Sequence, residues 1–274
     1  MKNTQFIKKG LNSLCMVVIV VVVASLCSTV KAAPLPVFNG WTMFADDTIV
    51  NDAIGGQPFN TEYLFYKSEG TILSIGLQTG FDVGDGKITW NGRNYYGGDL
   101  ALSFDGNISG AGGSGYEYAA DFGLFARDYH GNDKVSYAQS GGQDTGIDPA
   151  GLYGGVTWRN DLLYASAEPF AMDDSTTGKI ADALVHNSSG HGGNSYYRKV
   201  SFDTTKISET AGGDYVVHAH WTMNCGNDEI DGHFHHPGGK PIPEPTTIAL
   251  LGIGLAGLGG GYLRRKRRQR LEAK

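Results

Sequence analysis

Short runs of aromatic and β-branched residues recur along the middle of the chain, separated by clusters of glycine and aspartate. Such runs, when turn-forming residues bound them, predict β-strands. By this criterion we expect strands at residues 62–67, 71–77, 87–90, 99–104, 155–158, 197–202 and 215–222. Only residues 179–186 space their apolar positions as a helix does, which predicts one short helix. The pattern indicates an all-β fold with a single β-sandwich or jelly-roll-like domain.

The N-terminal residues have a different hydrophobic pattern. Three lysines precede an apolar run at residues 14–26, and the small-residue sequence Val30-Lys31-Ala32 follows it. This layout predicts a secretory signal peptide over residues 1–32, cleaved after Ala32. The alternative is an uncleaved membrane anchor. The 13 residues of the apolar run are short for a bilayer core, which needs roughly 20 residues, so cleavage is the favoured interpretation.

The C-terminal residues contain a second apolar segment. Residues 246–263 are eighteen residues without a charge, which as a helix would measure about 27 Å and just span a bilayer. Residues 237–245, rich in proline and glycine, are expected to be a linker between this transmembrane helix and the all-β domain at residues 33–236. The basic tail at residues 264–274 is expected to stay cytoplasmic, which places the domain outside the cytoplasm.

Charge separates the body of the protein from its tail. Residues 33–245 contain 11 basic and 27 acidic residues, a net charge of −16. Nucleic-acid binding requires a basic face, so the composition argues against a nucleic-acid partner. Cys225 is the only cysteine that follows the signal peptide, which excludes an intramolecular disulfide in the processed chain. A buried, inert thiol is favoured over a nucleophile or an intermolecular bridge.

Histidines are concentrated near the end of the domain, where five of the eight lie between residues 218 and 236. If residues 224–228 turn a hairpin, the i, i+2 pairs His218 with His220 and His233 with His235 would converge as a zinc or copper site. The competing interpretation makes His218 and His220 the solvent side of a strand whose other face is buried. That face would comprise Tyr215, Val217, Ala219 and Trp221. Strand alternation alone explains the spacing, which favours this second interpretation, without a cofactor.

Aromatic residues suggest a further alternative, a carbohydrate-binding module. Tryptophan and tyrosine rings can stack on sugar rings, although in most proteins they pack inside the fold. The candidates are Trp41, Trp90, Trp158 and the pairs Tyr95-Tyr96 and Tyr196-Tyr197. A row of exposed rings on one sheet would favour the module, whereas a concave pocket with three convergent histidines would favour a metal-dependent enzyme.

The extreme C-terminus combines three unlike elements in a fixed order. Pro243-Glu244-Pro245 precedes the apolar segment, and a basic cluster follows it, formed by Arg264, Arg265, Lys266, Arg267 and Arg268. This order resembles the PEP-CTERM sorting signal of Gram-negative bacteria. The resemblance implies that exosortase, a membrane protease, recognises Pro243, Glu244 and Pro245, while the basic cluster holds the tail in the cytoplasm.

The resemblance also implies a function. Proteins with this signal accompany exopolysaccharide and biofilm production, so we expect an exported, non-enzymatic protein of the cell surface or extracellular matrix. Its partners would be exosortase, the membrane during transient anchoring in the inner membrane, and exopolysaccharide. The alternatives are the carbohydrate-binding module and a metal-dependent enzyme that uses the histidines between His218 and His236.

Overall fold

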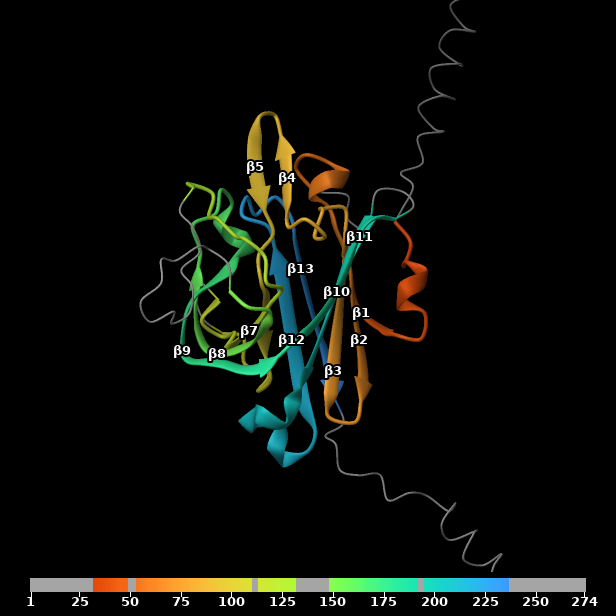
Figure 1. The fold of residues 1–274 in the computed structure, drawn as a ribbon, viewed down its shortest axis with the longest axis vertical. Helices are drawn as coiled ribbons and strands as arrows, with labels where there is room; N and C mark the ends of the chain where they lie inside the picture. The colour runs from red at the N-terminus through yellow and green to blue at the C-terminus, as the bar shows by residue number, and fades with distance from the viewer. Residues whose placement is uncertain (1–31, 49–52, 110–112, 132–147, 192–194, 237–274) are drawn as a thin grey trace, which may run out of the picture.

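The computed structural model describes residues 32–48, 53–109, 113–131, 148–191 and 195–236. Within these ranges the chain forms two antiparallel β-sheets packed against each other, as Figure 1 shows. The five-stranded sheet has the order β1 (Thr42–Asp46), β2 (Thr61–Glu69), β3 (Ile72–Thr79), β11 (Ser195–Asp203), β10 (Leu184–His191). The six-stranded sheet has the order β13 (Glu229–His236), β12 (Tyr215–Thr222), β6 (Leu100–Ser103), β7 (Tyr118–Asp121), β8 (Gly151–Arg159), β9 (Ala171–Asp182). The predicted all-β, sandwich-like fold is confirmed.

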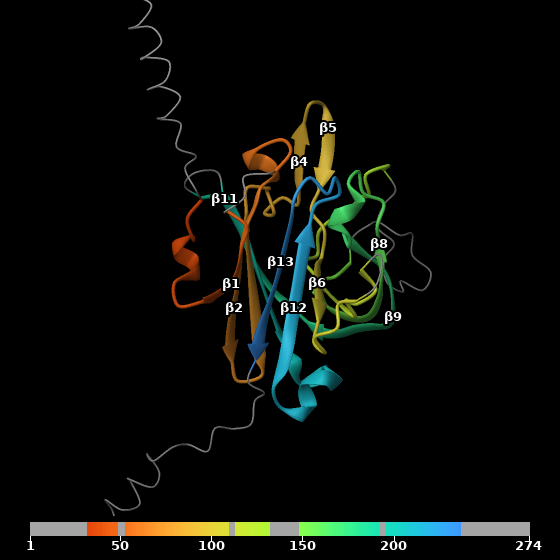
Figure 2. The ribbon, with the colours of Figure 1, turned by 180° about the vertical axis from the view of Figure 1, so that it is seen from behind.

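Smaller elements complete the described part of the chain. A separate hairpin of β4 (Lys87–Trp90) and β5 (Arg93–Tyr96) projects from one end of the domain (Figure 1). Helical turns among the described residues are short 3-10 segments: η1 (Pro36–Phe38), η2 (Gln57–Phe59), η4 (Ala165–Ala167), η5 (Thr204–Lys206) and η6 (Ser208–Gly212). Strand β13 ends at the end of the domain opposite the β4–β5 hairpin, as the view from behind shows (Figure 2). The chain therefore leaves the sandwich away from the projecting hairpin.

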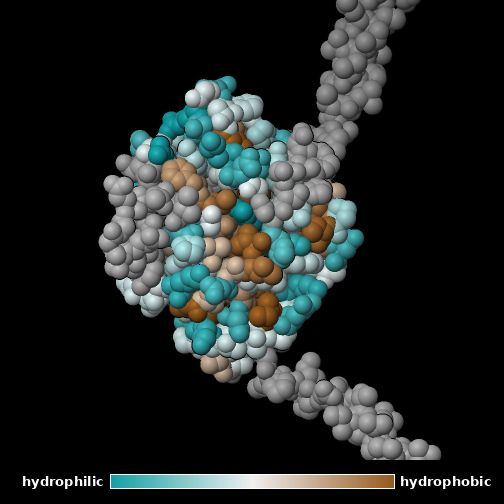
Figure 3. All heavy atoms as spheres, in the orientation of Figure 1, coloured by the Kyte–Doolittle hydropathy of each residue, from teal (hydrophilic) through white to brown (hydrophobic). Residues whose placement is uncertain are grey.

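The main hydrophobic core lies between the two sheets. Leu64 and Ile75 contribute to it from the five-stranded sheet, and Leu102, Val217 and Trp221 contribute from the six-stranded sheet. All five side chains are almost completely buried, and removal of such apolar area from water is the main source of folding free energy. On the face drawn in Figure 3, hydrophilic residues predominate and hydrophobic residues lie in small groups among them.

Strand β12 shows why apolar residues occupy every second position of residues 215–222. Tyr215, Val217, Ala219 and Trp221 point into the core, as the alternation predicts. The neighbouring edge strand β13 is held by aromatic contacts to the other sheet. The Phe234 ring stacks on the Tyr66 ring of β2, with centroids 3.8 Å apart and an angle of 4° between the ring planes. This contact fixes the β12–β13 hairpin relative to both sheets.

The residues just after the predicted signal peptide cover the outer face of the five-stranded sheet. Leu35 and Phe38 pack there against Tyr63 and Phe65 in a second buried cluster. Gly76 of β3 makes this packing possible, because a Cβ atom at that position would lie 2.2 Å from a ring carbon of Phe38. The segment that follows the predicted cleavage site therefore belongs to the folded domain.

The helix predicted for residues 179–186 is wrong. Residues 179–182 form the end of β9, and residues 184–186 begin β10. Ala181 pairs with Leu152 in the six-stranded sheet, whereas Val185 pairs with Val200 in the five-stranded sheet. The chain thus passes from one sheet to the other within this segment, as strands at the corners of sandwiches do. An isolated helix of eight residues is only marginally stable. Hydrogen bonding to strands of the two sheets therefore determines the structure of this segment, in spite of its helical spacing of apolar residues.

Candidate functional site

The candidate site lies on the outer face of the β12–β13 hairpin. The chain turns between Thr222 and Glu229, so the predicted hairpin around residues 224–228 is confirmed. In its antiparallel register His218 lies opposite His233, and His220 lies opposite Asp231. Because directly opposite residues of paired strands share a face, these side chains all project from one side of the hairpin, away from the core.

The four histidines of the predicted metal site share this face but do not converge. The rings of His218 and His233 stack with centroids 5.0 Å apart and an interplanar angle of 20°. His235 lies opposite Val216 and is exposed. His220 contacts an acidic residue instead of a second imidazole, because the register places Asp231 opposite it.

His220 is buried, contrary to the prediction that it lies on the solvent side of the strand. Its exposed fraction is 2 %, because the loops that carry Tyr116 and Pro169 cover it. Its Nδ1 lies 2.8 Å from Oδ1 of Asp231, and its Nε2 lies 2.9 Å from the carbonyl oxygen of Pro169. A carbonyl oxygen only accepts hydrogen bonds, so Nε2 carries a proton and Nδ1 faces the carboxylate.

Two acidic side chains accompany His220. One ligand atom each from His220, Glu229 and Asp231 lies within 4.8 Å of the others, the only such set of three among the described residues. The Tyr116 hydroxyl donates a hydrogen bond of 3.2 Å to Oδ1 of Asp231. These groups line a pocket of about 490 Å³, into which Glu168 and Ile108 also face. Asp231, Glu229 and Tyr116 were not among the residues that the sequence singled out.

The electrostatics of this site follow from burial and from the close approach of its groups. Although 53 % of the Asp231 side chain is exposed, loss of water at its carboxylate raises the pKa; the hydrogen bond and the charge of His220 outweigh this effect, so the pKa lies below its ordinary value. Burial is also the largest effect on Glu229, where it raises the pKa. Burial and the neighbouring Asp231 raise the pKa of Tyr116, so its hydroxyl stays protonated and donates a hydrogen bond to the carboxylate. The site concentrates negative charge around one buried imidazole.

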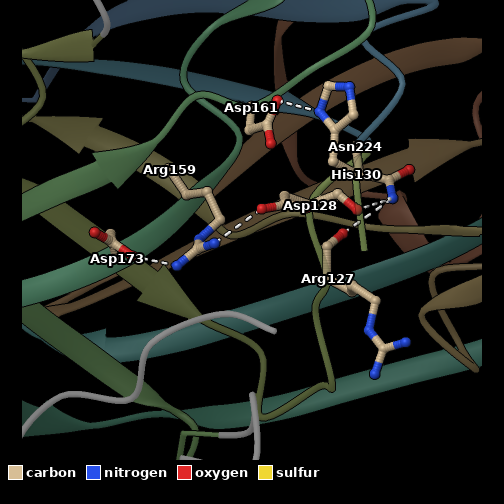
Figure 4. A network of polar contacts seen from close by, with 7 residues as sticks. All are labelled: Arg127, Asp128, His130, Arg159, Asp161, Asp173 and Asn224. Atoms are coloured by element: carbon tan, nitrogen blue, oxygen red, sulfur yellow. Dashed lines mark hydrogen bonds and ion pairs between the residues drawn. The ribbon is translucent and has the colours of Figure 1, made fainter. Parts of the chain in front are cut away.

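A second polar cluster lies behind the hairpin turn and is drawn in Figure 4. Arg159 donates one hydrogen bond of 2.9 Å to Asp128 and another of 2.7 Å to Asp173. Asn224, in the β12–β13 turn, donates to the carbonyl oxygen of Arg127 at 2.9 Å. His130 and Asp161 form a further hydrogen bond at the surface. The cluster fastens the loop at residues 124–131 to β8, β9 and the hairpin that carries the candidate site.

The C-terminal residues of the chain match a known sorting signal. A family model of the PEP-CTERM protein-sorting motif matches residues 241–268. The chain carries a PEP-CTERM motif. The sorting signal predicted from the sequence is therefore confirmed, and the motif marks an exported protein that exosortase processes at the membrane and that is destined for the cell surface. No curated protein and no solved structure matches the chain.

The sorting residues of the PEP-CTERM motif lie outside the described residues. This holds for Pro243, Glu244 and Pro245, for the predicted transmembrane segment 246–263 and for the basic cluster at residues 264–268. In the part of the chain that the structure describes, no helix is long and apolar enough to cross a membrane. Four residues separate the end of β13 at His236 from the start of the motif, a length that spans at most roughly 14 Å.

The aromatic residues considered for sugar binding lie on different sheets. Trp90 is on the projecting hairpin, where its ring contacts Phe59 edge-on. Trp158 is on β8 of the six-stranded sheet and donates a hydrogen bond from Nε1 to the Tyr116 carbonyl. Trp41 packs at the outer face of the five-stranded sheet. These three rings therefore do not form one row.

Cys225 is a buried free thiol, as the sequence predicts. Burial raises the pKa of the Cys225 thiol to about 11. At pH 8 this leaves about 100-fold less thiolate than at an ordinary cysteine. We expect Cys225 of the native protein to react with Ellman's reagent at least about 100-fold more slowly than in 6 M guanidinium chloride.

The matched control for this measurement is Cys225→Ala, which identifies any signal from Cys15 and Cys27 in chains that keep the signal peptide. If Cys225 reacts in the native protein as fast as in the unfolded chain, the inert-thiol interpretation is wrong.

Proposed function

We propose that the protein is an exported surface or extracellular-matrix protein, associated with exopolysaccharide, that acts by binding and not by catalysis. The observation that carries this proposal is the PEP-CTERM motif at residues 241–268, directly after an all-β domain. Strand β13, which precedes the motif in the sequence, ends at the end of the domain opposite the β4–β5 hairpin (Figure 2). While the chain is anchored, this hairpin would therefore lie at the end of the domain farthest from the membrane. Exosortase cleavage near Pro245 then frees this domain for the matrix.

Two features of the domain support a non-enzymatic role. The Cys225 thiol is fully buried and has a raised pKa, so it is a poor nucleophile. Both ring nitrogens of His220 are engaged by protein groups, Asp231 and the Pro169 carbonyl, so the imidazole has no nitrogen directed at a hydroxyl nucleophile. The net charge of −16 over residues 33–245 also keeps the released domain apart from anionic surfaces.

Processing can be tested in the native host. We expect the mature protein to lack the 29 residues that follow Pro245, and to keep them in a strain without exosortase. Replacement of Pro243, Glu244 and Pro245 by alanine should have the same effect as loss of exosortase, because the apolar segment at residues 246–263 is unchanged and still anchors the chain. Intact mass of the protein from cell fractions and from the medium distinguishes the two forms.

The control variant is Pro237→Ala, which removes a proline upstream of the motif and should leave processing unchanged. Detection of Lys274 in protein from exosortase-positive cells would show that residues 246–263 are a plain anchor. Trimming of the alanine variant at the same bond would show that Pro243, Glu244 and Pro245 do not direct the cleavage.

A further inference from the structure

We propose that His220, Glu229 and Asp231 bind a divalent transition-metal cation of the zinc type. The proposal concerns the acidic pocket on the β12–β13 hairpin and is independent of how the protein is sorted. It differs from the four-histidine site expected from the sequence, of which only His220 takes part. Three observations carry it: the orientation of the imidazole, the spacing of the ligand atoms and the pocket beside them.

The first observation is that His220 is already held as a metal ligand would be. Metal-binding histidines usually donate their second ring N–H to a carbonyl or carboxylate, which fixes the tautomer and the orientation of the ring. In His220, Nε2–H donates to the Pro169 carbonyl at 2.9 Å. This contact leaves Nδ1 directed at the carboxylates. With 2 % of the residue exposed, the ring loses little freedom when a cation binds.

The second observation is the spacing of the ligand atoms. Ligands about 2.1 Å from a tetrahedral zinc ion lie roughly 3.4 Å from one another. Nδ1 of His220 and Oδ1 of Asp231 are 2.8 Å apart, so they need to separate by only a few tenths of an ångström. Glu229 lies within 4.8 Å of both. The cation would replace the proton that Nδ1 and Oδ1 share, and this proton would be released to solvent on binding.

The third observation is the pocket of about 490 Å³ that these side chains line. Three protein ligands and one open position are the arrangement of zinc sites that keep a bound water, and the pocket provides the space for that water. Imidazole and carboxylate together favour zinc over magnesium, which prefers oxygen ligands and retains its own waters. Two carboxylates and a neutral imidazole also balance the charge of a dication.

The test is a titration of the full chain, purified in a mild detergent and freed of metal with EDTA, with Zn²⁺ alone. We expect one equivalent of Zn²⁺ to bind in calorimetry. At Zn²⁺ concentrations about 100-fold above Kd, the melting temperature should rise by roughly 5–10 °C. Mg²⁺ at the same concentration should leave the melting temperature unchanged. Glu229→Gln and Asp231→Asn should each raise the Kd for Zn²⁺ at least tenfold.

The matched control is the double variant His218→Ala with His233→Ala, which removes the stacked imidazole pair on the same face of the same hairpin. We expect its Kd for Zn²⁺ to stay within about twofold of the parent value. Loss of binding in this double variant together with full binding in Glu229→Gln and Asp231→Asn would assign the metal to the surface imidazole pair and overturn the proposal. Absence of saturable Zn²⁺ binding would overturn it too. The metal-free melting temperature of each variant verifies that the fold is retained.

Discussion

Trp221→Ala is expected to lower the free energy of unfolding by about 3–5 kcal/mol, the range for deletion of a fully buried large aromatic side chain. Trp221 has an exposed fraction of 0 % and lies in the core between the two sheets, where its ring contacts Phe81 edge-on with centroids 6.0 Å apart. Its Nε1 donates a hydrogen bond of 3.1 Å to the Gly98 carbonyl. The variant therefore loses packing and leaves a buried carbonyl without this donor.

The matched control is Trp90→Ala, which deletes the same side chain from the projecting β4–β5 hairpin. Trp90 has an exposed fraction of 40 %, so less apolar area returns to water and the cost should stay below about 2 kcal/mol. Urea titrations followed by far-UV circular dichroism measure both values. Equal losses for the two variants would contradict the placement of the main core between the sheets. Trp221→Phe gives a second measurement if the alanine variant does not fold.

Trp221 also illustrates what the sequence can predict about this fold. The alternation in residues 215–222 predicts β12 with its bounds and its buried face, and residues 87–90 predict β4 with equal accuracy. Both runs are rich in aromatic and β-branched residues, which fit the surface of a sheet. Strand β9 (Ala171–Asp182) is mostly polar and contains irregular pairing with β8. Its structure depends on pairing with β8, which is a tertiary property, so no local pattern reveals it.

The sequence likewise predicts one part of the candidate site and not the rest. Alternate residues of a β-strand point to the same face. The predicted hairpin therefore already implies that Glu229 and Asp231 share a face with His233 and His235. The exact register decides that His220 lies opposite Asp231, and the sequence does not specify it. Tyr116 and Pro169 reach His220 from distant loops. Such contacts arise only when the sandwich assembles, which explains why the burial of His220 was not foreseen.

The position of the site along the hairpin bears on its use at the cell surface. Glu229 begins β13, and His236 ends it at the end of the domain opposite the β4–β5 hairpin. Asp231 is five residues and Glu229 seven residues from His236, so the ligands lie roughly 17 to 24 Å from that end of the extended strand. The proposed cation site therefore lies away from the end of the domain that the sorting motif follows in the sequence.

The polar cluster behind the hairpin turn supports the same region and carries the second large effect. Asp128 is almost completely buried, with 1 % of its side chain exposed, whereas 38 % of the Asp173 side chain is exposed. Both carboxylates bind the same guanidinium group, that of Arg159 (Figure 4). A buried charge that loses its partner costs far more than an exposed one, because water cannot replace the lost interaction.

We therefore expect Arg159→Met to lower the free energy of unfolding by about 3–5 kcal/mol, because it removes the guanidinium from the buried Asp128 carboxylate. Asp173→Asn, the control at the exposed end of the same arginine, should cost less than about 1 kcal/mol. Asp128→Asn introduced into Arg159→Met should recover at least about 1 kcal/mol, since it removes the buried charge that has lost the guanidinium. Urea titrations of the four chains at pH 7 provide these differences. If Asp173→Asn costs as much as Arg159→Met, or if Asp128→Asn restores nothing, then packing of the arginine stem and not the buried ion pair holds this loop to the hairpin.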